Sequence, residues 1–136
     1  MGAWSHESFG NDDAGDFGYE LEEADDLAPV EAALDAVLES PDGYVDAGDA
    51  CQAIAAAEVI ARLQGRWGTR DTYSETVDAW VEKMKLEPPA ELVDKAVIVL
   101  DRIVGEDSEL AELWDESEDG ESWRAAVDEL RGRVRA

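Results

Sequence analysis

The chain has 136 residues, 45% of them hydrophobic, and a formal net charge of −24 at pH 7. Disordered chains combine high charge with low hydrophobicity, so this length and hydrophobic content predict one folded domain over residues 1–136. No apolar run approaches the roughly 18–20 residues of a membrane span, and the opening lacks the basic and apolar segments of a signal peptide. The single cysteine cannot form an internal disulfide. We therefore expect a cytoplasmic protein. The negative charge repels nucleic acids and anionic membranes, so we expect neither as a partner.

The chain opens with a Gly/Ser-rich lead, residues 1–10, that carries two large aromatic side chains, Trp4 and Phe9. Because such rings are costly to leave in water, we expect the lead to pack on the body of the domain. Asn11 or Asp12 is the predicted N-cap of the first helix, and the aspartates that follow suit the positive end of a helix dipole.

Apolar residues then recur at helical spacing along the chain, and Pro and Gly residues separate the periodic stretches. Predicted helices run over about 12–24, 29–40, 47–63, from a capping box at Thr72–Glu75 to before Pro88, over 90–104, in a short segment capped by Ser108, and over 121–135. No repeat and no hairpin chemistry is present. The expected fold class is an all-α, single-domain bundle of six or seven helices.

The predicted helix over 47–63 is apolar on nearly every side and rich in alanine. A helix without a polar face is usually the buried centre of a bundle, so we expect the other helices to surround it. Glu58 is the exception in this helix. It is either a partly exposed edge residue or a carboxylate that Arg62, four residues later, holds inside the protein.

The small number of histidine and cysteine residues excludes most catalytic arrangements. His6 is the only histidine, so the chain cannot build a pair of histidine metal ligands, and the residues around Ser5 do not resemble a nucleophile elbow. No Gly-rich phosphate loop is present. Cys51 lies in the Ala-rich helix without a nearby base and is expected to be a small buried hydrophobic residue. We therefore assign no catalytic residue and no cofactor.

The segment 42–49 partly matches the calcium loop of an EF-hand, with Asp42 and Asp46 at the fifth and ninth positions. The first carboxylate ligand is missing, and Asp49 replaces the bidentate glutamate at the twelfth position, so most of the ligand charge is absent. The structural alternative is a helix–turn–helix corner in which Asp46 caps the following helix.

A second acidic group lies at the start of the first predicted helix. Asp12 and Asp16 are four residues apart and Asp13 lies beside them, so they could hold a cation, although the helix dipole explains them more simply. No metal site is assigned. The candidate metal ligands are Asp12, Asp16, Asp42 and Asp46.

The opening of the chain resembles that of a bacterial family named only as domain-of-unknown-function family 4259. The residues that carry the resemblance are Trp4, Phe9, Asn11, Asp12, Asp13 and Asp16. The match extends over most of the chain, with a departure at Ser5-His6, where the family tends to carry Gly and a small or polar residue. The resemblance implies a small stand-alone bacterial protein and supplies no activity. These residues are then a signature of either binding or core packing.

The charge is unevenly distributed, because no Lys or Arg precedes Arg62 while sixteen Asp or Glu residues do. Such a field attracts basic partners, so we expect a non-enzymatic protein-binding module, for example an immunity or antitoxin-like protein that meets a basic effector. One alternative is a metal-dependent enzyme that places Asp12, Asp13, Asp16 and Glu58 around a metal in the bundle core. Another is a housekeeping protein whose acidity is an adaptation to salt or to solubility.

Overall fold

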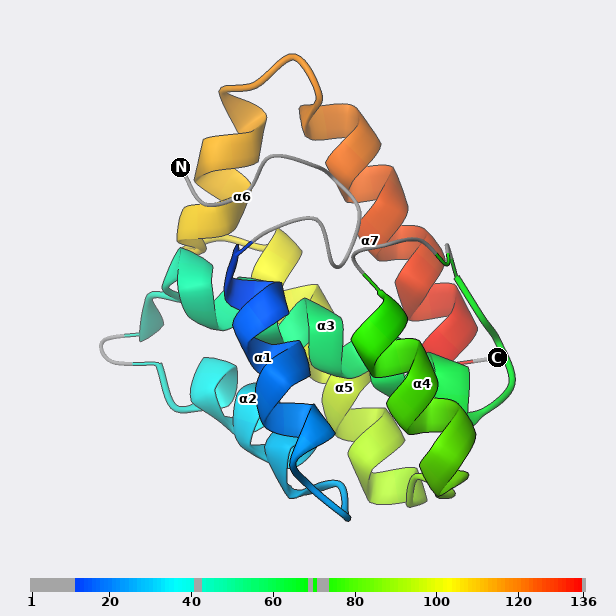
Figure 1. Ribbon diagram of the computed structural model, residues 1–136. Helices are drawn as coiled ribbons and strands as arrows, with labels where there is room; N and C mark the ends of the chain where they lie inside the picture. Colours follow the sequence, from blue (N-terminus) through cyan, green and yellow to red (C-terminus); the bar gives the residue numbers. More distant parts are fainter. Residues whose placement is uncertain (1–11, 41–42, 69, 71–73, 136) are drawn as a thin grey trace.

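The computed structural model describes residues 12–40, 43–68, 70 and 74–135, and this part of the chain forms seven α-helices (Figure 1). The helices are α1 (Asp12–Glu22), α2 (Ala28–Leu38), α3 (Ala47–Leu63), α4 (Glu75–Met84), α5 (Ala90–Val104), α6 (Glu109–Asp115) and α7 (Gly120–Arg135). The described residues contain no strand, and Val45 and Ser108 form an isolated parallel β-bridge. The predicted all-α bundle is therefore confirmed. The N-terminal lead, with Trp4, His6 and Phe9, lies outside the described residues.

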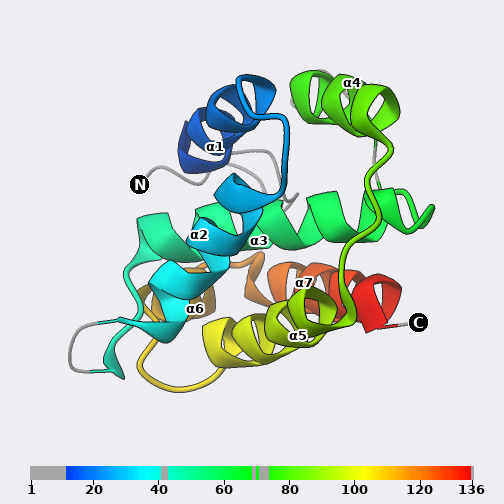
Figure 2. The same cartoon turned by 90° about the horizontal axis from the view of Figure 1, so that it is seen from below.

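Helix α3 is the centre of the bundle and packs against every other helix. All its residues from Ala50 to Arg62 are buried except Gln52. Figure 2 shows α3 between α1 and α4 on one side and α5 and α7 on the other. The many alanines allow these neighbours to approach closely, which confirms the predicted role of the Ala-rich helix.

The helix bounds follow the sequence pattern closely, with one correction. The bounds of α3 and α5 are those that the periodicity predicts, and Ser108 caps α6 by accepting a hydrogen bond from the amide of Ala111. The capping box predicted for α4 is wrong, because α4 begins at Glu75 with Ser74 at the N-cap position. Glu75 is therefore the first residue of the helix and not the third. Thr72 lies outside the described residues.

Two stacked rings hold α6 against α7. The centroids of Trp114 and Trp123 lie 6.2 Å apart with nearly parallel ring planes. The turn between the two helices brings Gly120 so close to α6 that a Cβ atom at this position would lie 2.5 Å from the carbonyl oxygen of Trp114. A residue without a side chain is required there.

No described helix is long and apolar enough to cross a membrane.

Candidate functional site

The outer side of α1, α2 and the turn between them carries a group of exposed carboxylates that we call the acidic face. Its members are Asp16, Glu20, Glu22, Glu23, Asp25, Asp26, Glu31 and Glu39. None of these carboxylates forms an ion pair with a described basic residue, and neither α1 nor α2 contains a Lys or Arg. Their negative charge is therefore not compensated by ion pairs. The nearest described cation is Lys95 of α5, which binds Asp35 of α2 over 2.7 Å and acts on Glu31 and Glu39 through its charge alone.

The turn at the centre of the acidic face is held in place by hydrogen bonds. The indole nitrogen of Trp80 on α4 donates to the carbonyl oxygen of Ala24 over 2.9 Å. The amide of Ala24 donates to the carbonyl oxygen of Leu21, and the carboxylate of Asp26 accepts from the amide of Ala28 at 3.0 Å. The backbone that carries the carboxylates from Glu22 to Asp26 is thus fixed on the body of the protein.

One large aromatic side chain lies within the acidic face. Tyr19 on α1 is 68% exposed; Asp16 and Glu22 lie three residues before and after it on the same helix, and Glu23 follows directly after the helix. A side chain on a helix covers the preceding turn, and the residue four positions before Tyr19 is Gly15, where an added Cβ atom would meet no other atom within 4 Å. The tyrosine ring is therefore accessible to a partner.

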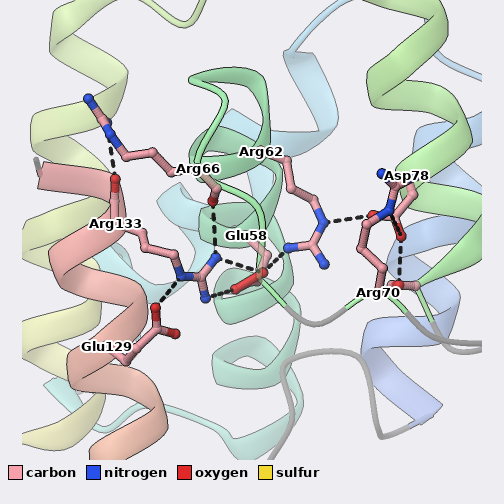
Figure 3. A network of polar contacts seen from close by, with 8 residues as sticks. Glu58, Arg62, Arg66, Arg70, Asp78, Glu129 and Arg133 are labelled. Carbon is pink, nitrogen blue, oxygen red and sulfur yellow. Dashed lines mark hydrogen bonds and ion pairs between the residues drawn. The ribbon is translucent and has the colours of Figure 1, made fainter.

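A second polar cluster is buried at the other end of the bundle, where α4 and α7 flank α3 (Figure 3). Glu58 and Arg62 on α3 are each only 2% exposed and form an ion pair four residues apart. The Nε atom of Arg62 also donates to Asp78 on α4 over 2.7 Å, and the hydroxyl of Ser74 donates to the second oxygen of Asp78 over 2.7 Å. The interpretation of Glu58 as a carboxylate held inside by Arg62 is confirmed.

Helix α7 contributes a second arginine to this buried charge network. Arg133 donates to both oxygens of Glu58 and also binds Glu129 over 2.5 Å. Arg133 and Arg66 each donate to the other's carbonyl oxygen, at 3.3 and 3.1 Å, which ties α7 to the loop after α3. Both oxygens of Glu58 are thus engaged by guanidinium groups.

The loop after α3 closes the buried charge network through Trp67. The guanidinium group of Arg70 lies 4.3 Å from the centroid of the Trp67 ring, and that of Arg62 lies 5.6 Å from it. Arg70 also binds Asp78 and Glu82. These contacts are favourable cation–π interactions and make the network a structural link between helices. The sequence indicated only the Glu58–Arg62 pair, since the other partners are distant along the chain.

Asp46 has the structural role that the sequence offered as the alternative to calcium binding. Its carboxylate accepts from the amides of Gly48 at 2.9 Å and Asp49 at 3.3 Å, which makes it the N-cap of α3. The preceding Tyr44 donates its hydroxyl to Glu112 on α6 over 2.5 Å, and this hydrogen bond raises the Tyr44 pKa to about 12. The segment is therefore a helix–turn–helix corner attached to α6.

Asp13 from α1 approaches the same corner, a proximity that the sequence did not predict. A Cβ atom at Gly48 would lie 3.1 Å from a carboxylate oxygen of Asp46 and 3.3 Å from one of Asp13. Burial, followed by the charges of Asp46 and Asp13, raises the pKa of Asp49. Burial and the same two carboxylates raise the pKa of the Cys51 thiol to about 12, which agrees with the expected buried, unreactive residue.

The other predicted site residues are only partly described. Asp16 lies exposed on the acidic face, and Asp12 is the first residue of α1, with a side chain outside the described part. Trp4, Phe9, Asn11 and Asp42 also lie outside the described residues. Within the described ranges, no group of three or more His, Cys, Asp or Glu side chains is arranged to hold a metal ion.

The family model described as Domain of unknown function (DUF4259) matches residues 2–126. No match was found among curated proteins or among solved structures.

Proposed function

We propose that this chain, which belongs to the family described as Domain of unknown function (DUF4259), is a non-enzymatic protein-binding module whose acidic face receives a basic partner. The observation that carries this proposal is the group of exposed, unpaired carboxylates on α1, α2 and their turn, in a part of the chain without a single Lys or Arg.

The distribution of the basic residues supports the proposal. Most arginines are already paired within the protein, with partners outside the acidic face, as for Arg124 with Asp115 and Arg131 with Asp101. The field of the acidic face therefore extends into solvent and would steer a positively charged protein toward it. Such complementarity mainly raises the association rate and is weakened by salt.

The fixed turn and the exposed ring of Tyr19 add to this argument. A surface that is already ordered loses little conformational entropy when a partner binds. Tyrosine is enriched at protein interfaces because its ring contributes a large contact area together with a polar group, and it can also stack on a cationic side chain. One form of this function is an immunity or antitoxin-like protein that neutralises a cationic effector.

The experiment is affinity capture with a variant that removes charge from the acidic face. The variant carries Glu20→Gln, Glu22→Gln, Glu23→Gln, Asp25→Asn and Asp26→Asn. We expect the wild-type protein to retain a basic protein, including a basic product of a neighbouring gene, at about 20 mM salt and to release it at about 300 mM, where screening is strong. The variant is expected to lose this partner.

A matched control separates the acidic face from the overall charge. The control removes five exposed carboxylates elsewhere, through Glu91→Gln, Asp94→Asn, Glu116→Gln, Glu118→Gln and Asp119→Asn. It has the same net charge as the variant and is expected to retain the partner. Equal loss in both proteins would show that only the net charge matters, and retention of no basic protein at low salt would favour acidity as a solvent adaptation.

A further inference from the structure

A pocket of about 310 Å³ lies between α5 and α7. Its apolar part is formed by Leu100, Val104 and Val127, and its polar part by Asp101, Arg124, Asp128 and Arg131. The volume is at the lower end of the range for small-molecule sites, which predicts a ligand of few atoms. Neither α5 nor α7 contributes a residue to the acidic face, so this pocket is separate from the proposed partner surface.

The two arginines of the pocket are both engaged by neighbouring groups. Arg131 donates two hydrogen bonds to Asp101, at 2.6 and 3.2 Å, from α7 to α5. Arg124 donates to both oxygens of Asp115, at 3.0 and 2.9 Å, and to the carbonyl oxygen of Val104 at 2.9 Å. Their positive charges are matched by these carboxylates, and their positions are fixed.

The carboxylate of Asp128 differs from the others in the pocket. It lies on α7 between the two arginines, is exposed, and forms no hydrogen bond or ion pair of its own with another described residue. The lining contains two carboxylates, Asp101 and Asp128, and two guanidinium groups, while Asp115, which binds Arg124 from outside the lining, adds a third carboxylate. The two arginines and their carboxylate partners are therefore neutral as pairs, and the charge of Asp128 is left next to an apolar wall.

This combination selects among ligand classes. An anion would meet the carboxylate of Asp128, which acts on Arg131 through its charge but binds no described partner, and the field of a chain with net charge −24. A neutral apolar molecule would cover the wall formed by Leu100 and Val127 but would remove water from Asp128 without replacing its hydrogen bonds. A small cation with a short apolar body would satisfy both parts of the pocket.

We propose that the pocket between α5 and α7 binds a free small organic cation, with its aliphatic or aromatic body against Leu100, Val104 and Val127 and its ammonium or guanidinium group on Asp128. The arginine pairs shape the two ends of the site.

The test is a titration with n-butylguanidinium chloride followed by ¹H–¹⁵N NMR. The titration is done at about 150 mM NaCl, where the field of distant charges is screened beyond about 8 Å. We expect saturable shifts in the amides around the pocket. Asp128→Asn is expected to weaken binding about fivefold, the size of one partly exposed charge pair. Asp94→Asn, which removes an exposed carboxylate from α5 outside the pocket, is expected to leave the affinity unchanged.

Three further comparisons decide the outcome. The uncharged n-butylurea is expected to bind more weakly than the cation, and Val104→Phe, which fills the pocket without changing charge, is expected to abolish saturable binding while thermal unfolding shows an intact fold. Non-saturable shifts spread over the acidic face, or an Asp128→Asn variant with wild-type affinity, would overturn the proposal. Tighter binding of a capped Gly-Arg-Gly peptide with the same dependence on Asp128 would assign the pocket to an arginine of a protein partner and overturn the free ligand.

Discussion

The indole nitrogen of Trp80 donates a hydrogen bond to the carbonyl oxygen of Ala24, 56 residues earlier in the chain. This bond attaches the turn between α1 and α2 to α4. Because the ring of Trp80 is buried, its N–H group would otherwise lack a partner. The position of the acidic turn thus depends on a side chain from a different part of the sequence.

The first prediction is that Trp80→Phe loosens this turn. The substitution keeps an aromatic ring but removes the donor, so we expect the free energy of unfolding to fall by about 1–3 kcal/mol from the lost hydrogen bond and the smaller ring. Hydrogen exchange of the Ala24 amide is expected to accelerate more than that of amides within α5. An unchanged exchange rate at Ala24 would show that Trp80 does not hold the turn.

The second prediction concerns the buried charge network. Arg62→Met removes the guanidinium group that binds Glu58 and Asp78 and leaves both carboxylates buried with fewer partners. Breaking a buried ion pair in this way costs about 3–5 kcal/mol, which urea denaturation measures. Arg70→Met serves as the control, because Arg70 is half exposed and its loss is expected to cost about 1 kcal/mol or less. Equal costs for the two variants would contradict the structural role of Arg62.

The third prediction compares two glycines. Gly120→Ala places a Cβ atom 2.5 Å from the Trp114 carbonyl oxygen, so the backbone must shift and the free energy of unfolding is expected to fall by about 1–3 kcal/mol. Gly15→Ala in α1 meets no atom within 4 Å, and alanine is the better helix former, so we expect a gain of about 0.5–1 kcal/mol. Thermal unfolding distinguishes the two, and a tolerated alanine at position 120 would disprove the close approach of α6 and α7.

The fourth prediction is a pH dependence that Tyr44 introduces. Its hydrogen bond to Glu112 raises its pKa from 10.0 to about 12 in the folded protein, so the folded state keeps the phenol proton longer than the unfolded state does. The contribution of this group to stability is complete below pH 10 and is lost as the pH rises through about 12. Urea denaturation between these pH values should show a steeper loss of stability for the wild type than for Tyr44→Phe. Parallel curves would contradict the shift.

The sequence predicted the helices well because their signals are local. The apolar period of 90–104 and the turn residues around Pro41 and Pro88 are readable within a few positions, and Asp46 caps α3 through the amides of the next residues. The capping box at Thr72 was wrong because a four-residue pattern does not by itself fix the first residue of a helix, and α4 begins at Glu75 with Ser74 at the N-cap position.

The sites were harder to predict because they join distant residues. The pair Glu58–Arg62 follows from helix spacing, but Asp78 lies 16 residues from Arg62, and Arg133 lies 75 residues from Glu58. No local pattern relates such residues, since their contact results from how α4 and α7 pack on α3. The pocket between α5 and α7 has the same origin. The acidic face could be anticipated from the charge of the first 61 residues, whereas the hydrogen bond that fixes its turn could not.

The contact between Glu58 and Arg133 also has a consequence for biosynthesis. The central helix is made early, yet the second guanidinium group that compensates its buried carboxylate comes from the last turn of α7. A nascent chain that has reached only α6 would lack both this guanidinium group and the helix that packs on this side of α3, so Glu58 would still be open to water. Completion of the fold should thus follow synthesis of α7 and not proceed helix by helix on the ribosome.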